Sequence, residues 1–407
     1  MKRAYERLLL DRLKQFPCVA VLGPRQCGKT TLLESLRKPW RRFDLERSAD
    51  FEVISRDPDL FFRLNPRQVA LDEAQVHPPV FSALRVAIDE HRRERGRFVI
   101  TGSSSPALVR NISETLAGRV AIIEMAPLSC LEAYGGQRPP LASLLKGGKV
   151  TAQDFESLKP RLTLSQIHSY WLKGGYPEPW VRRGAAFRTA WMENYFQTYI
   201  QRDVARLFPG LNQAKFRLFS QQLAGFSGSI VNCADLGRAL GISSVTAQEY
   251  LGIAEGSYLW RNLPAYGKGP LRRLVKHPKG FLRDTGILHH FIRVNDLASL
   301  MAHPRMGASW EGLVTEELLR GLAMEGVPHE AYYYRTYAGG EVDLVLEGNF
   351  GTVPIEIKHA QTLTHYDLRS LTDFVQEHKC EWGLVVHNGA EVRRLTERIV
   401  SIPFACL

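Results

Sequence analysis

The chain has few cysteines and no long apolar run. Its 407 residues include six cysteines, which lie far apart and form no Cys-x-x-Cys pair. This spacing argues against a zinc site and a disulfide framework, and it favours a reducing compartment. No stretch approaches the roughly 20 apolar residues of a membrane span. The charged N-terminal segment lacks the apolar core of a signal peptide. We therefore expect a cytoplasmic protein without a membrane partner.

Acidic residues are outnumbered by basic ones. The sequence holds 53 Lys and Arg against 42 Asp and Glu, a formal net charge of +11. Such an excess attracts polyanions, nucleic acid above all, although a basic surface can also serve solubility alone. At roughly 100–200 residues per domain, the length predicts about two to four domains.

Short apolar runs alternate with helical patterns over residues 1–135. The expected strands are Cys18–Leu22, Arg41–Leu45, Gln68–Leu71, Phe98–Thr101 and Val120–Met125. Strands separated by helices are typical of a parallel sheet covered by helices. This pattern predicts an α/β domain.

A linker and a helical lid are expected over residues 136–208. The stretch 136–160 is rich in Gly and Pro and resembles a loop or linker, and the helical pattern begins at residue 161. Trp191, Tyr195 and Tyr199 follow one another at four-residue spacing, which places them on one helix face and indicates core packing.

The first motif with chemistry follows the first expected strand. Residues 23–30 read Gly-Pro-Arg-Gln-Cys-Gly-Lys-Thr and match the phosphate-binding loop G-x-x-x-x-G-K-[ST] without deviation. The glycines let backbone amides face phosphate oxygens, and the next helix directs its positive dipole end at the same charge. Lys29 is expected to contact the β- and γ-phosphates of ATP, and the Thr30 hydroxyl to ligate Mg²⁺. The predicted nucleotide-binding residues are Gly23, Pro24, Arg25, Gln26, Cys27, Gly28, Lys29, Thr30 and Thr31.

A second motif supplies carboxylates at the end of a strand. The apolar run from Val69 ends in Asp72 and Glu73. Asp72 is expected to hold the water shell of Mg²⁺, and Glu73 to polarise the attacking water, which a nucleotide-binding switch would not require. The next strand leads to Thr101 and Ser103, each a candidate sensor of the γ-phosphate. We therefore predict a Mg²⁺-dependent ATPase with Lys29 and Glu73 as catalytic residues.

Several segments resemble the AAA+ ATPases. They are GPRQCGKT, LDEAQ, ITGSSS, LAGRV and GGYPE. The resemblance is greatest to a bacterial and archaeal group that joins such a module to a C-terminal domain of uncharacterised function, and in looser form it spans nearly the whole chain. It implies that Arg119 is an arginine finger inserted into a neighbouring subunit's site, and hence a homo-oligomer such as a hexameric ring. A surface salt bridge or an intramolecular sensor is the alternative for Arg119.

A winged-helix domain is expected over residues 209–300. Residues 234–240 and 244–251 read as two helices joined by a turn, which is helix-turn-helix spacing, and 258–261 and 280–282 as the strands of a wing. Basic residues without acidic ones fill the stretch between Arg261 and Arg283, a composition suited to phosphate contacts with DNA. The predicted DNA contacts are Lys268, Arg272, Arg273, Lys276 and Lys279. Winged helices also bind proteins, so a protein partner stays open.

Residues 301–407 return to strands and carry a second acidic motif. Glu356 and Lys358 alternate on one expected strand, so they share a face, and Asp343 on the neighbouring strand can join them. The pattern resembles the PD-(D/E)xK nuclease fold, also called restriction-endonuclease-like, and Glu311 matches its acidic helix position. This resemblance implies a second Mg²⁺ or Mn²⁺, but such folds also survive as binding modules.

The sequence thus predicts an oligomeric AAA+ ATPase of α/β architecture that acts on DNA, at branched or broken structures, through translocation or remodelling. Two alternatives stay open. One is a regulatory switch that acts on protein partners, and the other is a metal-dependent nuclease gated by ATP.

Overall fold

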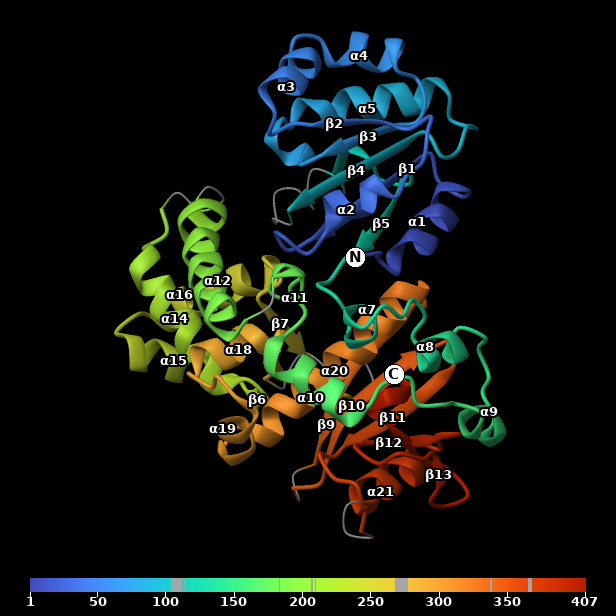
Figure 1. Cartoon of the computed structure of the whole chain (residues 1–407), viewed down its shortest axis with the longest axis vertical. Coiled ribbons are helices and arrows are strands. Elements are labelled where there is room, and N and C mark those ends of the chain that lie inside the picture. Colours follow the sequence, from blue (N-terminus) through green and yellow to red (C-terminus); the bar gives the residue numbers. More distant parts are fainter. Residues whose placement is uncertain are drawn as a thin grey trace. The chain divides into compact units, whose positions relative to one another are not determined.

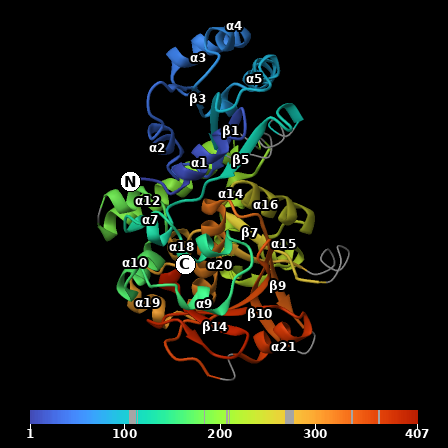
Figure 2. The same cartoon turned by 90° about the vertical axis from the view of Figure 1, so that its right-hand side faces the viewer.

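The chain forms two compact units. The computed structural model describes residues 1–103, 112, 114–182, 184–205, 208, 210–267, 277–336, 339–364 and 368–407. The first unit comprises residues 1–128 with 256–258, and the second residues 129–255 with 259–407. The first unit holds one five-stranded sheet, and the second holds a three-stranded and a six-stranded sheet (Figures 1 and 2). None of the helices in the described part of the chain combines the length and hydrophobicity of a membrane span.

The sheet of the first unit is parallel throughout. Its strands are β1 (Cys18–Gly23), β2 (Arg41–Asp44), β3 (Val69–Asp72), β4 (Phe98–Ser103) and β5 (Val120–Glu124). They pair in the order β2-β3-β4-β1-β5. Every residue of β1 and β3 is buried, as strands covered on both faces require. The predicted parallel sheet is confirmed, and β4 separates the strand of the phosphate-binding loop from the acidic strand β3.

Helices flank this sheet. They are α1 (Tyr5–Leu13), α2 (Lys29–Glu34), α3 (Ser48–Ser55), α4 (Pro58–Leu64), the 3₁₀ turn η1 (Ala74–Val76) and α5 (Pro79–Glu90). In α1, Tyr5, Leu9 and Leu13 recur every four residues and are all buried, which explains the helix and its orientation. Figure 1 shows α3, α4 and α5 beside β2 and β3, and α1 and α2 beside β1.

The middle of the second unit alternates helices with short strands. These are α14 (Gln213–Phe226), β6 (Ser229–Ile230), α15 (Cys233–Leu240), α16 (Ser244–Gly256), β7 (Trp260–Leu263) and β8 (Lys279–Leu282). The Asn232 side chain accepts a hydrogen bond from the Ala234 amide at 2.9 Å and so starts α15, and Gly241, in the left-handed conformation (φ 62°), ends it. The strands pair antiparallel in the order β6-β8-β7. Both predicted helices are present, whereas the two-residue strand β6 was not predicted.

The C-terminal sheet has six strands. They are β9 (His329–Arg335), β10 (Glu341–Gly348), β11 (Gly351–Ile357), β12 (Gly383–His387), β13 (Arg393–Arg394) and β14 (Ile399–Pro403), in the order β13-β14-β12-β11-β10-β9. The neighbours β9, β10 and β11 are antiparallel, whereas β11, β12 and β14 are parallel. The long α20 (Met306–Glu325) precedes this sheet, and α21 (Arg369–Glu377) packs against β10 and β11 (Figure 2).

The predicted loop over residues 136–160 is correct only in part. This stretch forms α8 (Pro140–Leu145) and α9 (Ala152–Glu156), and Leu141, Leu145 and Phe155 are buried in one core with the C-terminal sheet. The prolines misled the prediction, because proline at the first helical position starts a helix rather than breaking it. Further helical elements within the described residues are α7 (Cys130–Ala133), α10 (Leu164–Lys173), α11 (Glu178–Val181), α12 (Ala185–Thr198), the π-helical η2 (Tyr199–Val204), α18 (Thr285–Phe291), α19 (Leu297–Ala302) and the 3₁₀ turn η4 (Phe404–Cys406).

Candidate functional site

The phosphate-binding loop joins β1 to α2. Its backbone adopts the left-handed conformation at Gln26 (φ 59°) and at Gly28 (φ 101°). A β-carbon at Gly23 would lie 2.1 Å from the carbonyl oxygen of Met125, so only glycine lets these two backbone segments approach this closely. Steric constraints therefore explain why glycine occupies positions 23 and 28 of the motif.

The lysine and threonine of the motif point toward different partners. Lys29 is buried, and its Nζ donates to the carbonyl oxygens of Gly23 (3.2 Å) and Pro24 (3.0 Å). Thr30 Oγ1 donates to Asp72 Oδ2 at 2.7 Å. The hydroxyl and the carboxylate that the motifs assign to Mg²⁺ thus meet at one point, and hard oxygen ligands of this kind suit that ion. These residues fit a bound Mg²⁺.

Glu73 lies just beyond β3 in a strained conformation. Its backbone is left-handed (φ 53°, ψ 45°), which is unusual for a residue with a side chain and is typical of functional sites. Its carboxylate accepts hydrogen bonds from the Ser103 hydroxyl (3.3 and 3.4 Å), the Ser103 amide (3.4 Å) and the Gln75 side chain. Burial favours the neutral acid, but Lys29 and these hydrogen bonds outweigh it and lower the pKa of Glu73. The carboxylate is therefore held in its charged, proton-accepting form.

The two candidate sensors differ in their contacts. Thr101 is buried; its hydroxyl donates to Asp72 Oδ1 and accepts from the Glu73 amide at 3.2 Å. Ser103 Oγ lies 3.5 Å from Lys29 Nζ as well as beside Glu73. Thr101 thus orients the acidic pair, whereas Ser103 lies between the lysine and the glutamate.

The remaining predicted residues of this site differ in their exposure and contacts. Arg119 forms a two-pronged ion pair with Asp89 of α5 (2.7 and 2.9 Å) and donates to the Ala117 carbonyl at 3.0 Å. Thr31 is exposed on α2, and Arg25 is half-buried. Cys27 is buried, and burial raises the pKa of its thiol, so it stays protonated.

One residue that was not predicted from the sequence supports the phosphate-binding loop. Arg3, which is buried, donates to the carbonyl oxygen of Cys27 through Nη1. Its Nη2 donates to the carbonyls of Ala126 (2.9 Å) and Pro127 (3.3 Å). An arginine near the N-terminus is too common for the sequence to single it out.

The predicted C-terminal residues do come together. Lys358 Nζ contacts Glu356 Oε1 at 2.7 Å, and Asp343 Oδ2 accepts from the Ile357 amide at 2.8 Å. Glu356 and Lys358 line a cavity of about 630 Å³ together with side chains of β9, β10 and α21. Burial and the nearby Asp343 raise the pKa of Glu356 to about 8.

The structure contradicts the DNA contact that was predicted at Lys279. It is 4% exposed, and its Nζ lies 2.5 Å from Glu311, 2.7 Å from Glu341 and 4.0 Å from Asp343. An ammonium buried among carboxylates is not available to a phosphate. The described residues offer no group of three or more His, Cys, Asp or Glu side chains that could hold a metal. The predicted second Mg²⁺ or Mn²⁺ therefore does not fit, because a lysine already neutralises these acids.

The other basic residues near β7 and β8 divide into two sets. Arg261 and Arg283 both contact Glu316 of α20, and they hold the pKa of that buried carboxyl at about 2 against the effect of burial. The predicted contacts Lys268, Arg272, Arg273 and Lys276 lie outside the described residues.

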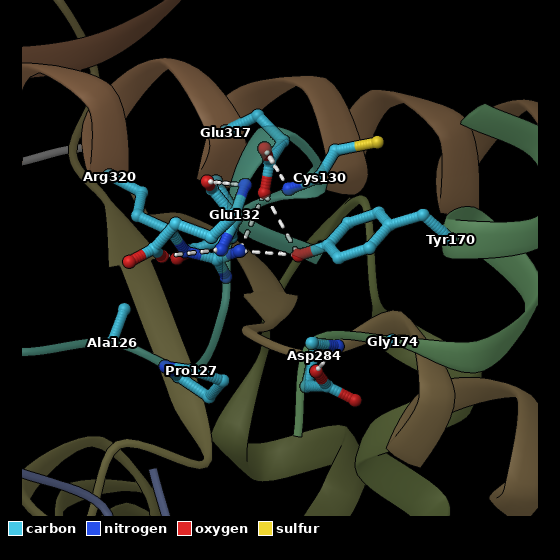
Figure 3. Close-up of polar contacts among 12 residues, drawn as sticks. Ala126, Pro127, Cys130, Glu132, Tyr170, Gly174, Asp284, Glu317 and Arg320 are labelled. Atoms are coloured by element: carbon cyan, nitrogen blue, oxygen red, sulfur yellow. Dashed lines mark hydrogen bonds and ion pairs between the residues drawn. The ribbon is translucent and has the colours of Figure 1, made fainter. Parts of the chain in front are cut away.

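A second buried polar cluster was not predicted. Figure 3 shows the carboxylate of Glu317, which accepts from the Cys130 amide (2.8 Å), the Tyr170 hydroxyl (3.0 Å) and Arg320 (2.5 Å). Asp284 nearby accepts from the Gly175 amide at 2.7 Å. These contacts connect the GGYPE segment (residues 174–178) and α7 to the core of the second unit. They indicate that this segment has a structural role.

Known families match the chain in three parts. An AAA domain matches residues 15–134, a domain of unknown function (DUF8612) matches residues 164–298, and another (DUF4143) matches residues 306–407. Together with the loop, β3 and the strand order, the first match makes the N-terminal part an AAA-type P-loop ATPase domain.

Two curated mycobacterial proteins match nearly the whole chain. They are the uncharacterized proteins Mb2031c of Mycobacterium bovis and Rv2008c of Mycobacterium tuberculosis, each 32% identical over 393 residues, which is 96% of this chain and 81% of the relative. The chain belongs to their family. Because both relatives are uncharacterized, the activity is argued from the AAA domain and the residues of its site.

Solved structures give weaker likenesses. The Walker-type ATPase PABY2304 of Pyrococcus abyssi is 15% identical, with a TM-score of 0.43 over 71% of this chain and 94% of its own. A RuvB variant of Thermotoga maritima is 17% identical, with a TM-score of 0.30 over 64% of this chain and 89% of its own. Scores this low do not establish a shared whole-chain architecture.

Proposed function

We propose that this protein hydrolyses ATP, with Glu73 as the base that polarises the attacking water. The supporting observation is the state of Glu73. It follows the acidic strand, Ser103 and Gln75 hold its carboxylate, and Lys29 lowers its pKa. A carboxylate that is ionised and fixed in position is what water activation requires. A switch that only binds nucleotide has no use for it.

Each polar side chain has a separate task in this proposal. Lys29 would neutralise the β- and γ-phosphates once ATP displaces its carbonyl contacts. Thr30 and Asp72 would hold Mg²⁺, which would offset charge on the phosphate oxygens. Thr101 keeps Asp72 and the Glu73 backbone in register. Ser103, which lies between Lys29 and Glu73, is placed to respond to the presence of a γ-phosphate.

The test separates binding from hydrolysis. Purified wild-type and Glu73→Gln protein are compared for phosphate release and for binding of a fluorescent ATP analogue. We expect the variant to bind the analogue and to release almost no phosphate. Hydrolysis at the wild-type rate in Glu73→Gln would overturn the proposal, and Glu90→Gln, an exposed glutamate of the same domain, is the matched control.

We propose DNA as the partner that couples to this turnover. The favouring observation is the order of elements α14, β6, α15, α16, β7 and β8, which matches the order expected of a winged helix. The segment 268–276, which lies between β7 and β8 in the sequence, is the expected wing. This segment contains Lys268, Arg272, Arg273 and Lys276 and no acidic residue. The described face of α16 supplies no cation, since its exposed side chains include Val245, Gln248 and Glu249. Phosphate contacts would therefore come from the wing.

The DNA proposal has its own measurement. Duplex binding is followed against salt concentration for wild type and for the variant with alanine at Lys268, Arg272, Arg273 and Lys276. Each lost phosphate contact should flatten the log–log slope by about 0.9. An unchanged slope would remove DNA from this surface and favour a protein partner. ATP turnover with linear, single-stranded and four-way DNA then identifies the DNA class that stimulates it.

Assembly is the remaining element. The proposed role of Arg119 as a finger requires a second subunit, so we propose a homo-oligomer. The dependence of specific activity on protein concentration tests it.

A further inference from the structure

The C-terminal acidic cluster already contains a cation. Four carboxylates lie in it: Glu311, Glu341, Asp343 and Glu356. Lys358 contacts Glu356 from one side. Lys279 reaches the other three from β8, and its side chain is more deeply buried than any of the three. The lysine therefore occupies the interior of the cluster.

We propose that Lys279 is the resident cation of this cluster and occupies the place that a nuclease of the resembled fold gives to a divalent metal. Carboxylates that face one another without a cation repel, so each such cluster needs a counter-charge. The ammonium supplies it with three donors. A divalent ion would have to displace this buried ammonium, or bind beside it against like charge.

The backbone keeps Lys279 in place. Its strand, β8, is the central strand between β6 and β7, and Lys279 itself pairs with Ile230 and Leu263. The Tyr333 hydroxyl donates to the carbonyl of His277, two residues earlier, at 2.7 Å. A side chain that begins from a strand held on both sides cannot withdraw far from its partners.

Neighbouring ion pairs follow the same pattern. Arg261 on β7 and Arg283 just after β8 both contact Glu316, which lies on α20 five residues after Glu311. Three cations from this pair of strands are thus bound by acids of α20 and β10. The cluster joins the three-stranded sheet to the C-terminal domain, and it is not a metal-dependent cleavage centre.

The experiment uses Mn²⁺ as the probe and full-length protein without nucleotide. All proteins carry Asp72→Asn, so that the ATPase site does not contribute metal binding. We expect Mn²⁺ to leave the melting temperature of this background unchanged. Adding Lys279→Gln should create a stabilisation by Mn²⁺ of a few degrees, because three carboxylates lose their counter-ion. Adding Asp343→Asn as well should abolish that gain.

The controls keep the outcome decisive. Lys146 pairs with Glu325 at 3.3 Å, outside the cluster, so Lys146→Gln removes a lysine–glutamate contact that involves none of the four carboxylates and should gain no response to Mn²⁺. Lys279→Gln protein that shows no response would overturn the proposal. If Lys279→Gln does not fold, the electron paramagnetic resonance signal of free Mn²⁺ is measured instead in the presence of the Asp72→Asn protein. An undiminished signal supports the proposal, and a loss of signal that Asp343→Asn abolishes overturns it.

Discussion

The ATPase site and the C-terminal cluster both combine buried lysines with carboxylates near strand ends, yet the lysines lie differently. In the ATPase site, Lys29 donates to the carbonyls of its own loop, and the Asp72 carboxylate accepts hydrogen bonds from the hydroxyls of Thr30 and Thr101. In the C-terminal cluster, Lys279 contacts the carboxylates themselves. The first arrangement leaves oxygens for Mg²⁺, whereas the second neutralises them. A list of acids and lysines is therefore not enough to identify a catalytic site.

The largest expected effects are on ATP turnover, when residues of the ATPase site are mutated and compared with a residue of the C-terminal cluster. Lys29→Ala should abolish measurable ATP turnover, and Glu73→Gln should lower it up to about 10⁴-fold, the upper range for loss of general base catalysis. Glu356→Gln, the equivalent change in the C-terminal cluster, should leave turnover within about twofold. Steady-state phosphate release measures all three. A large loss of turnover in Glu356→Gln would show that the two sites are coupled and would break the comparison.

Arg119 is the next test, because it too is paired with a carboxylate, but at the surface. As a finger in trans it is worth about 10³-fold or more in turnover, and mixing Arg119→Ala with Lys29→Ala protein should restore some activity. To reach a neighbour, Arg119 must leave Asp89, so Asp89→Ala should preserve turnover. Equal losses in Arg119→Ala and Asp89→Ala, with no recovery on mixing, would make the ion pair structural.

Local sequence predicted the ATPase site better than the C-terminal cluster for a physical reason. The phosphate-binding loop is one continuous segment, and Asp72 and Glu73 follow a strand whose burial is visible as an apolar run. Lys279, in contrast, meets acids more than thirty residues away in the sequence. Local sequence groups it with the nearby basic residues, although its place at the start of the buried strand Lys279–Leu282 indicates burial.

The pKa values predict a response to pH at the C-terminal cluster and none at the ATPase site. The pKa of Glu311, like that of Glu356, is raised to about 8, first by burial and then by Asp343. Acids with a raised pKa in the folded state stabilise it fully below their ordinary pKa and lose that contribution as pH rises toward 8. The second unit should therefore become less stable between about pH 5 and 8.

Chemical denaturation at several pH values measures this loss. Glu356→Gln should reduce the slope of unfolding free energy against pH, which is at most about 1.4 kcal/mol per pH unit for one proton. The pKa of Glu73 is lowered, so Glu73 stays ionised and its titration should not change ATP turnover over the same range. Stability that rises toward pH 8 would contradict the raised pKa values of Glu311 and Glu356.

The smallest expected effect concerns Arg3, a cation that supports its site without neutralising it. The amides of the phosphate-binding loop can face a phosphate only while its carbonyls point away, and Arg3 holds the carbonyl of Cys27 in that direction. Arg3→Ala should raise the KM for ATP about 10-fold, consistent with the loss of a hydrogen bond from a charged donor, and should change kcat much less. Arg3→Lys should recover only part of this loss, because one ammonium cannot reproduce the guanidinium fork that also binds Ala126 and Pro127. Arg7→Lys on the exposed side of α1 is the matched control. An unchanged KM in folded Arg3→Ala protein would show that the loop keeps its shape without this contact.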